Sequence, residues 1–473
     1  MPRERKVFAG GRIRHLRQAM GLSQAAMAKA LDVSGSYLNL VESDQRPLTT
    51  QLLLRLAEVY DLDLRDLRGD AQARLAAELT EMLTDPVFGK KMPPSAAIVD
   101  LAAGNPDIAA AFLTLYSAYR KSIVAGRDAR PEQDREVPPG DERFPIDEVR
   151  DHFHRSSNYI EELDVAAEDL YGRLAGTDEM YTALRAHLWD RHKVKVLVLP
   201  LHAMSDVQRR FDRHSMRLFL SEMLPIPSRI FQLGVQIAVL EQGALINTLI
   251  DAAGLKTDEA RRLYRIGLAN YFAGALMMPY EAFFQAAESV RYDVDPLAHR
   301  FGASIEQVSH RLTTLQKRTR RGIPFFLLRL DNAGNISKRF SAGGFHFARF
   351  GGTCSRWRVH DAFSTPGQII VQPVELPDRT RYLTISRTVS VPQGAYPDSG
   401  RKLVVSLGCE AAYADRIVYG DGIDMTAQHA ATPIGVTCRM CERHNCSARA
   451  FPPMTRPLTI DAERKGFSAF EFR

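Results

Sequence analysis

Residues 22–43, LSQAAMAKALDVSGSYLNLVES, decide the fold of the N-terminal part of the chain. Apolar residues recur at helical spacing on both sides of the short segment DVS. Ser23 is a suitable N-cap for the first of these helices, which should end near Leu31. In the segment GSYLNLVES, Leu38 and Val41 share the inward face of a second helix. The pattern therefore predicts a helix-turn-helix, in which the N-terminal end of the second helix faces the major groove of DNA.

The neighbouring sequence supplies a small core for this motif. Apolar residues recur at helical spacing across four expected short helices, and they are Ile13, Leu16, Met20, Met27, Leu31, Leu38, Val41, Leu52 and Leu56. The alternative interpretation is a generic small helical bundle with a solvated basic face. Agreement between the turn, the cap and the core spacing favours the DNA-binding interpretation.

Side chains that stay outside this core are the expected DNA contacts. The first helix offers cations for backbone phosphates, the start of the second helix offers an amide beside free backbone N–H groups, and the recognition helix offers short polar side chains. The residues are Arg12, Arg14, Arg17, Gln24, Ser34, Ser36, Tyr37 and Asn39. The segments LSQAAMAKAL and YLNLVESDQRP resemble the second and third helices of the lambda-repressor-like (Xre-type) helix-turn-helix family.

Composition places the whole chain among ordinary multidomain proteins. It has 473 residues, of which 45% are hydrophobic and 25% charged, and a net charge of +6. A basic balance permits a polyanionic partner. The N-terminus lacks the apolar region of a secretory signal, and the most apolar segments are well short of a membrane span. We therefore expect a cytoplasmic protein with no membrane partner.

Changes in composition and hydrophobic periodicity along the chain predict the domain organisation. Residues 1–70 form the helix-turn-helix domain, 71–125 a helical connector that also serves dimerisation, and 126–145 a charged, proline-rich linker. Residues 146–321 are mixed, with one clear strand in VKVLVLPL, and residues 322–473 form short β-rich runs divided by Gly and Pro. The expected fold class is multidomain and mainly α, with an α+β middle domain and a β-rich α+β C-terminal domain.

The middle domain resembles the ImmA/IrrE-type metallopeptidases but lacks their motif. In that family a helix carries H-E-x-x-H, whose histidines bind zinc and whose Glu is the general base. The corresponding residues of the segment RIFQLGVQIAVLEQG are Val235 to Val239, and none of them is a zinc ligand. We therefore expect a scaffold without hydrolytic chemistry, and a protein that is not an enzyme.

Near the C-terminus, cysteines are concentrated in the stretch GVTCRMCERHNC. Cys438, Cys441 and Cys446 form C-x₂-C-x₄-C. Thiolates this close repel one another unless a cation neutralises them, and both zinc and iron–sulfur clusters bind thiolates. The expected fourth ligand is Cys409 at the end of a strand, Cys354 is the reserve, and His444 would complete a Cys₃His zinc site.

The order of all these parts resembles the short-chain fatty acyl regulators of bacteria. The segments FARFGGTCSRWRVHDAF, LGCEAAYADRIVYGDG and TPIGVTCRMCERHNCSARAFPP carry this resemblance in the tail. It implies a DNA-binding regulator of propionate, methylcitrate, acetate or glyoxylate genes that responds to CoA or a short acyl-CoA. We expect a homodimer, formed through the helices after residue 70.

The resemblance also implies two further sites. A [4Fe-4S] cluster, with structural zinc as the alternative, would be bound by Cys409, Cys438, Cys441 and Cys446. Residues that suit the phosphates and the adenine of CoA are Tyr271, Tyr280, Arg329, Asn335, Lys338 and Arg339. Two rival functions remain: a zinc metallopeptidase fused to a repressor head, and a phage-type repressor that responds only to redox state.

Overall fold

The computed structural model describes most of the chain. The described ranges are residues 22–42, 70–83, 85–88, 93–128, 145–174, 179–204, 207–343, 353–391, 400–427, 429–453, 456–461 and 465–472, together with single positions beside them. The chain divides into two compact units, Met1–Asp141 and Glu142–Arg473. The division falls within the segment that the sequence assigns to a linker.

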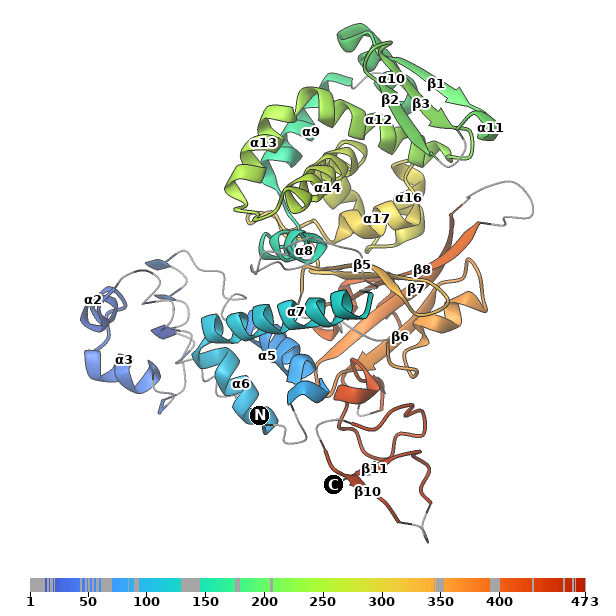
Figure 1. The fold of residues 1–473 in the computed structure, drawn as a ribbon. Helices are drawn as coiled ribbons and strands as arrows, with labels where there is room; N and C mark the ends of the chain where they lie inside the picture. The colour runs from blue at the N-terminus through green and yellow to red at the C-terminus, as the bar shows by residue number, and fades with distance from the viewer. Residues whose placement is uncertain are drawn as a thin grey trace. The chain divides into compact units, whose positions relative to one another are not determined.

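The first unit is helical wherever the structure describes its secondary structure. Its helices are α2 (Gln24–Ala30), α3 (Gly35–Glu42), α5 (Asp70–Leu83), α6 (Ser95–Gly104) and α7 (Pro106–Asp128), with a 3₁₀ turn at Pro86–Phe88 (Figure 1). It contains two small cores. The buried residues of the first are Ile13, Met27, Ala28, Leu31, Leu38, Val41, Leu52 and Leu56, most of which the sequence predicted. The second core lies between α5, α6 and α7 and includes Leu79, Ile98 and Leu113.

The second unit begins with a mainly helical layer. Its helices are α8 (Pro145–Arg155), α9 (Glu161–Leu174), α10 (Met180–His192), α11 (Leu201–Met204), α12 (Ile226–Glu241), α13 (Gly243–Ala252), α14 (Asp258–Met277), α15 (Tyr280–Ser289), α16 (Val294–Arg300) and α17 (Ile305–Leu312). The expected strand is β1 (Lys195–Leu199). It belongs to a three-stranded sheet with β2 (Arg209–Asp212) and β3 (Arg217–Ser221), which the sequence analysis missed. The segment RRFD has one apolar residue and RLFLS has three in a row, so neither alternates as a half-buried strand does.

The C-terminal part is built on a six-stranded sheet. In sheet order its strands are β5 (Ile336–Ser341), β4 (Phe326–Leu330), β8 (Arg401–Glu410), β7 (Arg381–Val391), β6 (Ile370–Glu375) and β9 (Thr432–Pro433). All neighbouring pairs are antiparallel except β6 and β9. A small pair, β10 (Leu458–Thr459) and β11 (Glu471–Phe472), follows. Short 3₁₀ helices lie at Arg358–Phe363, Ala411–Arg416, Val418–Gly420 and Cys438–Met440. The β-rich texture that the sequence predicted is confirmed.

The two faces of this large sheet belong to two different cores. Side chains alternate between the faces of a strand. On β8, Val405, Leu407 and Cys409 join the core shared with the helices, which lie over this face in Figure 1. Val404, one position away, packs instead with Cys354 and Trp357 in the core of the opposite face. The face to which each side chain points therefore decides which cysteines can lie close together.

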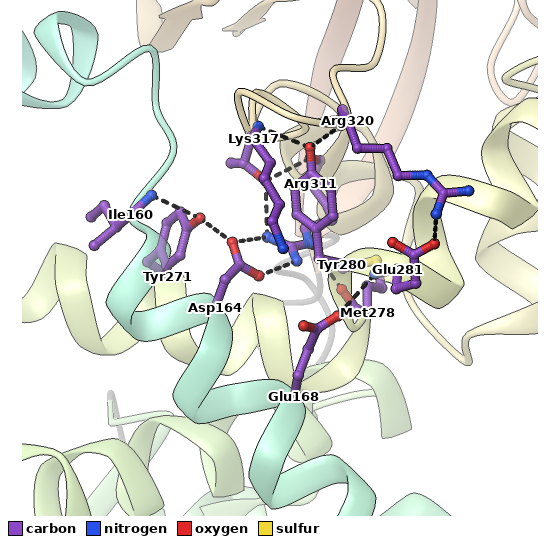
Figure 2. A network of polar contacts seen from close by, with 11 residues as sticks. Ile160, Asp164, Glu168, Tyr271, Met278, Tyr280, Glu281, Arg311, Lys317 and Arg320 are labelled. Carbon is purple, nitrogen blue, oxygen red and sulfur yellow. Dashed lines mark hydrogen bonds and ion pairs between the residues drawn. The ribbon is translucent and has the colours of Figure 1, made fainter.

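A second motif that looks like a helix-turn-helix, α16 and α17, is structural. Ser304 and Gln307 form a reciprocal capping box at the start of α17, with Gln307 N to Ser304 Oγ at 3.2 Å and Ser304 N to Gln307 Oε1 at 2.7 Å. Farther along this helix Arg311 is buried against Asp164 of α9 (Figure 2). The motif is thus a packed corner of the second unit.

Two helix pairs have apolar stretches of membrane-span length. Within the described residues, no single helix is long and apolar enough to cross a membrane. The pairs Ser95–Gly104 with Pro106–Tyr116 and Ile226–Glu241 with Gly243–Ala252 reach that length and composition together, but each is sharply bent.

Candidate functional sites

A buried carboxylate links the helical segments of the helix-turn-helix. Ser23 Oγ accepts from Ala26 N at 3.2 Å and caps α2, as the sequence predicts. Glu42, at the end of α3, is 2% exposed. It accepts from Arg17 Nε at 2.7 Å and from Gln24 Nε2 at 3.0 Å. The hydrogen bond from Arg17 to Glu42 raises the pKa of Arg17 despite its burial. Arg17 and Gln24 therefore tie the first two helical segments to the recognition helix.

The expected base-reading side chains lie at the exposed start of α3. Ser34, Ser36 and Asn39 are exposed, and Tyr37 is half-buried. Ser34 Oγ accepts from Tyr37 N at 3.1 Å and thereby caps this helix. Arg14 donates to Glu42 O at 3.2 Å, yet about half of its side chain stays accessible. Arg12 lies outside the described residues. Short polar side chains therefore lie exposed on the helix that would enter a groove, and one of them, Asn39, accepts from Gln24 Nε2 at 3.3 Å.

In the middle domain, the helix that carries H-E-x-x-H in peptidases is α12. Gln236 stands at the position of the catalytic Glu and is fully buried, and it accepts a hydrogen bond from Arg209. A neutral amide cannot act as a general base. Val235 is buried and Val239 is half exposed, so neither offers a donor to a metal. The expected loss of the peptidase motif thus corresponds to a packed helix.

The two tyrosines expected to bind CoA belong to a buried network (Figure 2). Tyr271 OH donates to Asp164 and accepts from Ile160 N at 3.0 Å. Tyr280 OH donates to Arg320 O at 2.8 Å and accepts from Lys317 N at 2.9 Å. Burial raises the pKa of Tyr280 to about 12. Both hydroxyls are satisfied within the protein and hold the core together.

The four polar residues expected beside them do not form a phosphate site either. Arg329 and Lys338 both form ion pairs with Glu306, at 2.8 and 2.6 Å, so one carboxylate holds both cations within the protein. Asn335 caps its own turn by donating to Asp331 at 3.0 Å. Arg339 is largely buried, with its guanidinium 3.8 Å from Asp147. The structure brings Arg329 and Lys338 together at Glu306, and within the described part of the chain neither is a hydrogen-bond partner of the Tyr271 or Tyr280 hydroxyl.

A large cavity lies elsewhere in the middle domain. Its volume is about 1070 Å³, and its walls come from α9, α10, α12, α14, α15 and the end of α16. The lining is mostly apolar and includes Met180, Ile230, Met277 and Phe301. Arg300 is an exposed cation in its wall. None of the six residues expected to bind CoA lines this cavity. Residue type alone suggested them, and residue type does not show which helix faces pack around a cavity.

Four of the five cysteines surround one small cavity in the C-terminal part. Cys354 lines it together with the loop cysteines Cys438, Cys441 and Cys446. Cys409, the expected fourth member, does not line it and faces the opposite side of the sheet. Burial raises the pKa of the Cys409 thiol to about 12, so this thiol stays protonated. The structure thus places Cys354, which the sequence held in reserve, beside the loop cysteines, and places Cys409 apart from them.

The loop that carries these cysteines is fixed by a buried arginine and a close contact. Arg449 is 5% exposed and donates to Cys438 O at 3.0 Å and to Cys441 O at 2.7 Å. A Cβ on Gly435 would lie 2.9 Å from Cys441 Sγ, so no larger residue fits there without a shift. His444 stacks on Phe472, with ring centroids 4.5 Å apart, and does not line the cavity.

Family models match three separate parts of the chain. A helix-turn-helix domain matches residues 9–71, an IrrE N-terminal-like domain residues 189–313, and the C-terminal domain of short-chain fatty acyl coenzyme A regulators residues 314–470. A solved structure, described as a Mycobacterium tuberculosis transcriptional regulator, is 38% identical. It superposes with a TM-score of 0.66 over 70% of this chain and 100% of that one.

Curated relatives extend over almost the whole chain. The propionyl-CoA carboxylase regulator of Cereibacter sphaeroides is 39% identical over 98% of this chain and 99% of its own. The regulators RamB and PrpR of Mycobacterium tuberculosis are each 38% identical, over 98% and 96% of this chain and 98% and 94% of theirs. All are named as regulators, which agrees with the expectation that this chain is not an enzyme. The chain belongs to the short-chain fatty acyl coenzyme A regulator family.

Proposed function

We propose that the protein is a homodimeric regulator of genes of short-chain acyl metabolism, whose affinity for operator DNA changes when CoA or a short acyl-CoA binds. The observation that carries the proposal is the joint presence of an accessible recognition helix and a ligand-sized cavity in one chain. An effector can shift a two-state equilibrium only by its differential affinity for the two states.

The DNA-binding part of the proposal rests on the helix-turn-helix. Ser36 and Asn39 are exposed on the recognition helix, where polar side chains can reach base edges. Arg17, which is occupied by Glu42, holds this helix in place rather than contacting a phosphate. Arg14 remains accessible enough to contact the DNA backbone.

Self-association is supported by an apolar stripe on α7. Ile108, Phe112 and Leu115 are 51%, 46% and 68% exposed and lie at i, i+4 and i+7, while Leu113 of the same helix is buried. A second copy could cover this stripe and present two heads to a palindromic operator. Leu115→Glu should convert the dimer to a monomer in light-scattering measurements, and an unchanged dimer would exclude this stripe as the contact.

The cavity bounded by α10, α12, α14 and α15 is the proposed effector site. Its volume of about 1070 Å³ is at the upper end of what small-molecule sites offer, and its apolar walls suit an acyl and pantetheine chain. Arg300 and His299 supply polar groups for the phosphates. This placement replaces the six residues expected from the sequence.

Four thiols that line one cavity are a ligand set that a [4Fe-4S] cluster takes, and structural zinc is the alternative. Cys354, Cys438, Cys441 and Cys446 would hold the cluster, and Gly435 and Arg449 would shape the loop around it. When bound, such a cluster supplies either a structural link or a response to oxidation.

The experiment is an operator titration by anaerobically purified protein, with and without propionyl-CoA. A shift in operator affinity that Ile230→Trp abolishes, by filling the cavity, supports the proposal. Arg300→Glu should weaken the acyl-CoA effect, and Arg262→Glu, an exposed arginine of α14 outside the cavity lining, serves as the control. Unchanged affinity at saturating propionyl-CoA, acetyl-CoA and CoA would refute acyl-CoA sensing. Stoichiometric iron and sulfide would support the cluster, and one zinc without iron would refute it.

A further inference from the structure

Two histidines of α10 and one glutamate of α12 converge at the ends of these helices. His187 Nε2 lies 2.6 Å from Glu241 Oε1, and His192 Nε2 lies 2.7 Å from the same oxygen. The three potential ligand atoms all lie within 4.8 Å of one another, the one such group found among the described residues. Their side chains are 14%, 20% and 10% exposed, so they are sheltered but reachable from solvent. Neither the DNA-binding, the effector nor the cysteine site uses them.

We propose that His187, His192 and Glu241 form a binding site for a divalent transition metal of the zinc class. Two imidazole nitrogens and one carboxylate are a ligand set that zinc accepts, with water in the fourth position. Tetrahedral zinc at about 2.1 Å from each atom requires ligand atoms about 3.4 Å apart. Each His–Glu pair must therefore open by roughly 0.7 Å, which small side-chain rotations provide.

One nearby cation must move when the metal binds. Arg191 Nε lies 3.8 Å from Glu241 Oε1, but its side chain is 64% exposed and makes no closer ion pair with this carboxylate. An exposed contact of this kind contributes little to stability. Displacing Arg191 into solvent therefore opposes metal binding only weakly.

The position of the site gives the metal a structural consequence. Met180 and Ala183, in the first half of α10, line the large cavity, and so do Ile226 and Ile230, in the first half of α12. The metal ligands lie toward the other ends of the same two helices. A bound metal would fasten together two walls of the cavity. The metal site itself stands whether or not the cavity binds an acyl-CoA.

The test is a calorimetric titration of the full-length protein with Zn²⁺ and Ni²⁺. Wild type should bind one equivalent that His187→Gln/His192→Gln loses. Because loss of an outer-shell partner already lowers metal affinity by about 10- to 100-fold, Glu241→Gln should lower it by at least about 100-fold. His202→Gln, a change at an exposed histidine of α11, is the matched control and should bind as wild type does.

A second variant and spectroscopy distinguish metal bound by the cysteines from metal bound by the histidines. Cys438→Ser should leave the histidine-dependent equivalent intact. X-ray absorption should be measured on the zinc equivalent that wild type binds and the double histidine variant does not. Its shell should contain nitrogen and oxygen at about 2.0–2.1 Å and no sulfur at about 2.3 Å. Equal binding by wild type and the double histidine variant, or an all-sulfur shell, would overturn the proposal. Circular dichroism and gel filtration must first show that each variant is folded.

Discussion

The buried carboxylate of Asp164 provides the sharpest test of what stabilises the second unit. Its side chain is 2% exposed and is the counterion of Arg311, which is 3% exposed. It also accepts from Tyr271 OH, so three elements, α9, α14 and α17, meet at one carboxylate (Figure 2). Burial opposes the charge of Arg311, but Asp164 and Tyr271 bring the pKa of Arg311 above its usual value. Because an arginine guanidinium is not deprotonated in proteins, the charge of Arg311 remains when Asp164 is removed.

Asp164→Ala leaves that charge buried without a counterion. Arg311 keeps Met278 O at 2.9 Å and Thr314 Oγ1 at 3.0 Å, but neither of these is charged. Breaking a buried ion pair from one side costs about 3–5 kcal/mol, so we expect a loss of about 4 kcal/mol in the free energy of unfolding. With a urea m-value of about 3 kcal/mol per molar, the unfolding midpoint should fall by about 1.3 M.

Urea unfolding followed by circular dichroism measures this loss, and α9 provides its own control. Asp169 pairs with Arg173 at 3.3 Å, but both side chains are more than half exposed, so Asp169→Ala should cost only about 0.5 kcal/mol. Replacing both partners, as Asp164→Leu with Arg311→Met, should cost less than Asp164→Ala alone. A cost below about 1 kcal/mol for Asp164→Ala would refute the assignment of this pair as a stabilising centre.

Three further changes test the pH dependence, the cysteine loop and the recognition helix. Burial, together with the charge of nearby Lys338, lowers the pKa of His310 to about 3. As the pH is lowered, the unfolded chain takes up this proton first, so the stability decreases between about pH 6.5 and pH 3. Unfolding at pH 7.0 and 5.5 should show His310→Gln losing about 1.2 kcal/mol less stability than wild type, and equal losses would refute a neutral His310 in the folded protein. Gly435→Ala should lower the iron content per protein because its Cβ would meet Cys441, whereas Gly172→Ala, at an open position of α9, should not; full iron occupancy in Gly435→Ala would contradict this. Asn39→Ala should weaken specific operator binding roughly 5- to 150-fold in fluorescence anisotropy and leave binding to unrelated DNA unchanged, and an equal loss on both would indicate a phosphate contact instead.

Local spacing in the sequence was enough for the features that depend on nearby residues. The helix-turn-helix, its Ser23 cap and its apolar core follow from helical periodicity and the chemistry of helix ends. The missing peptidase motif is visible directly in the five residues Val235 to Val239. The cysteine loop is apparent because three cysteines lie within nine positions.

Contacts between distant segments were decided by the tertiary structure. Cys354 rather than Cys409 lies with the loop cysteines. Neighbouring residues of a strand point to opposite faces of the sheet, and Cys409 points to the face away from the loop. Tyr271 and Tyr280 looked like ligand contacts, but packing gave their hydroxyls partners in the core. His187, His192 and Glu241 show no motif spacing, since two helix ends bring them together. Periodicity fixes which side chains share a face, whereas the partner of that face depends on how the helices and the sheet pack.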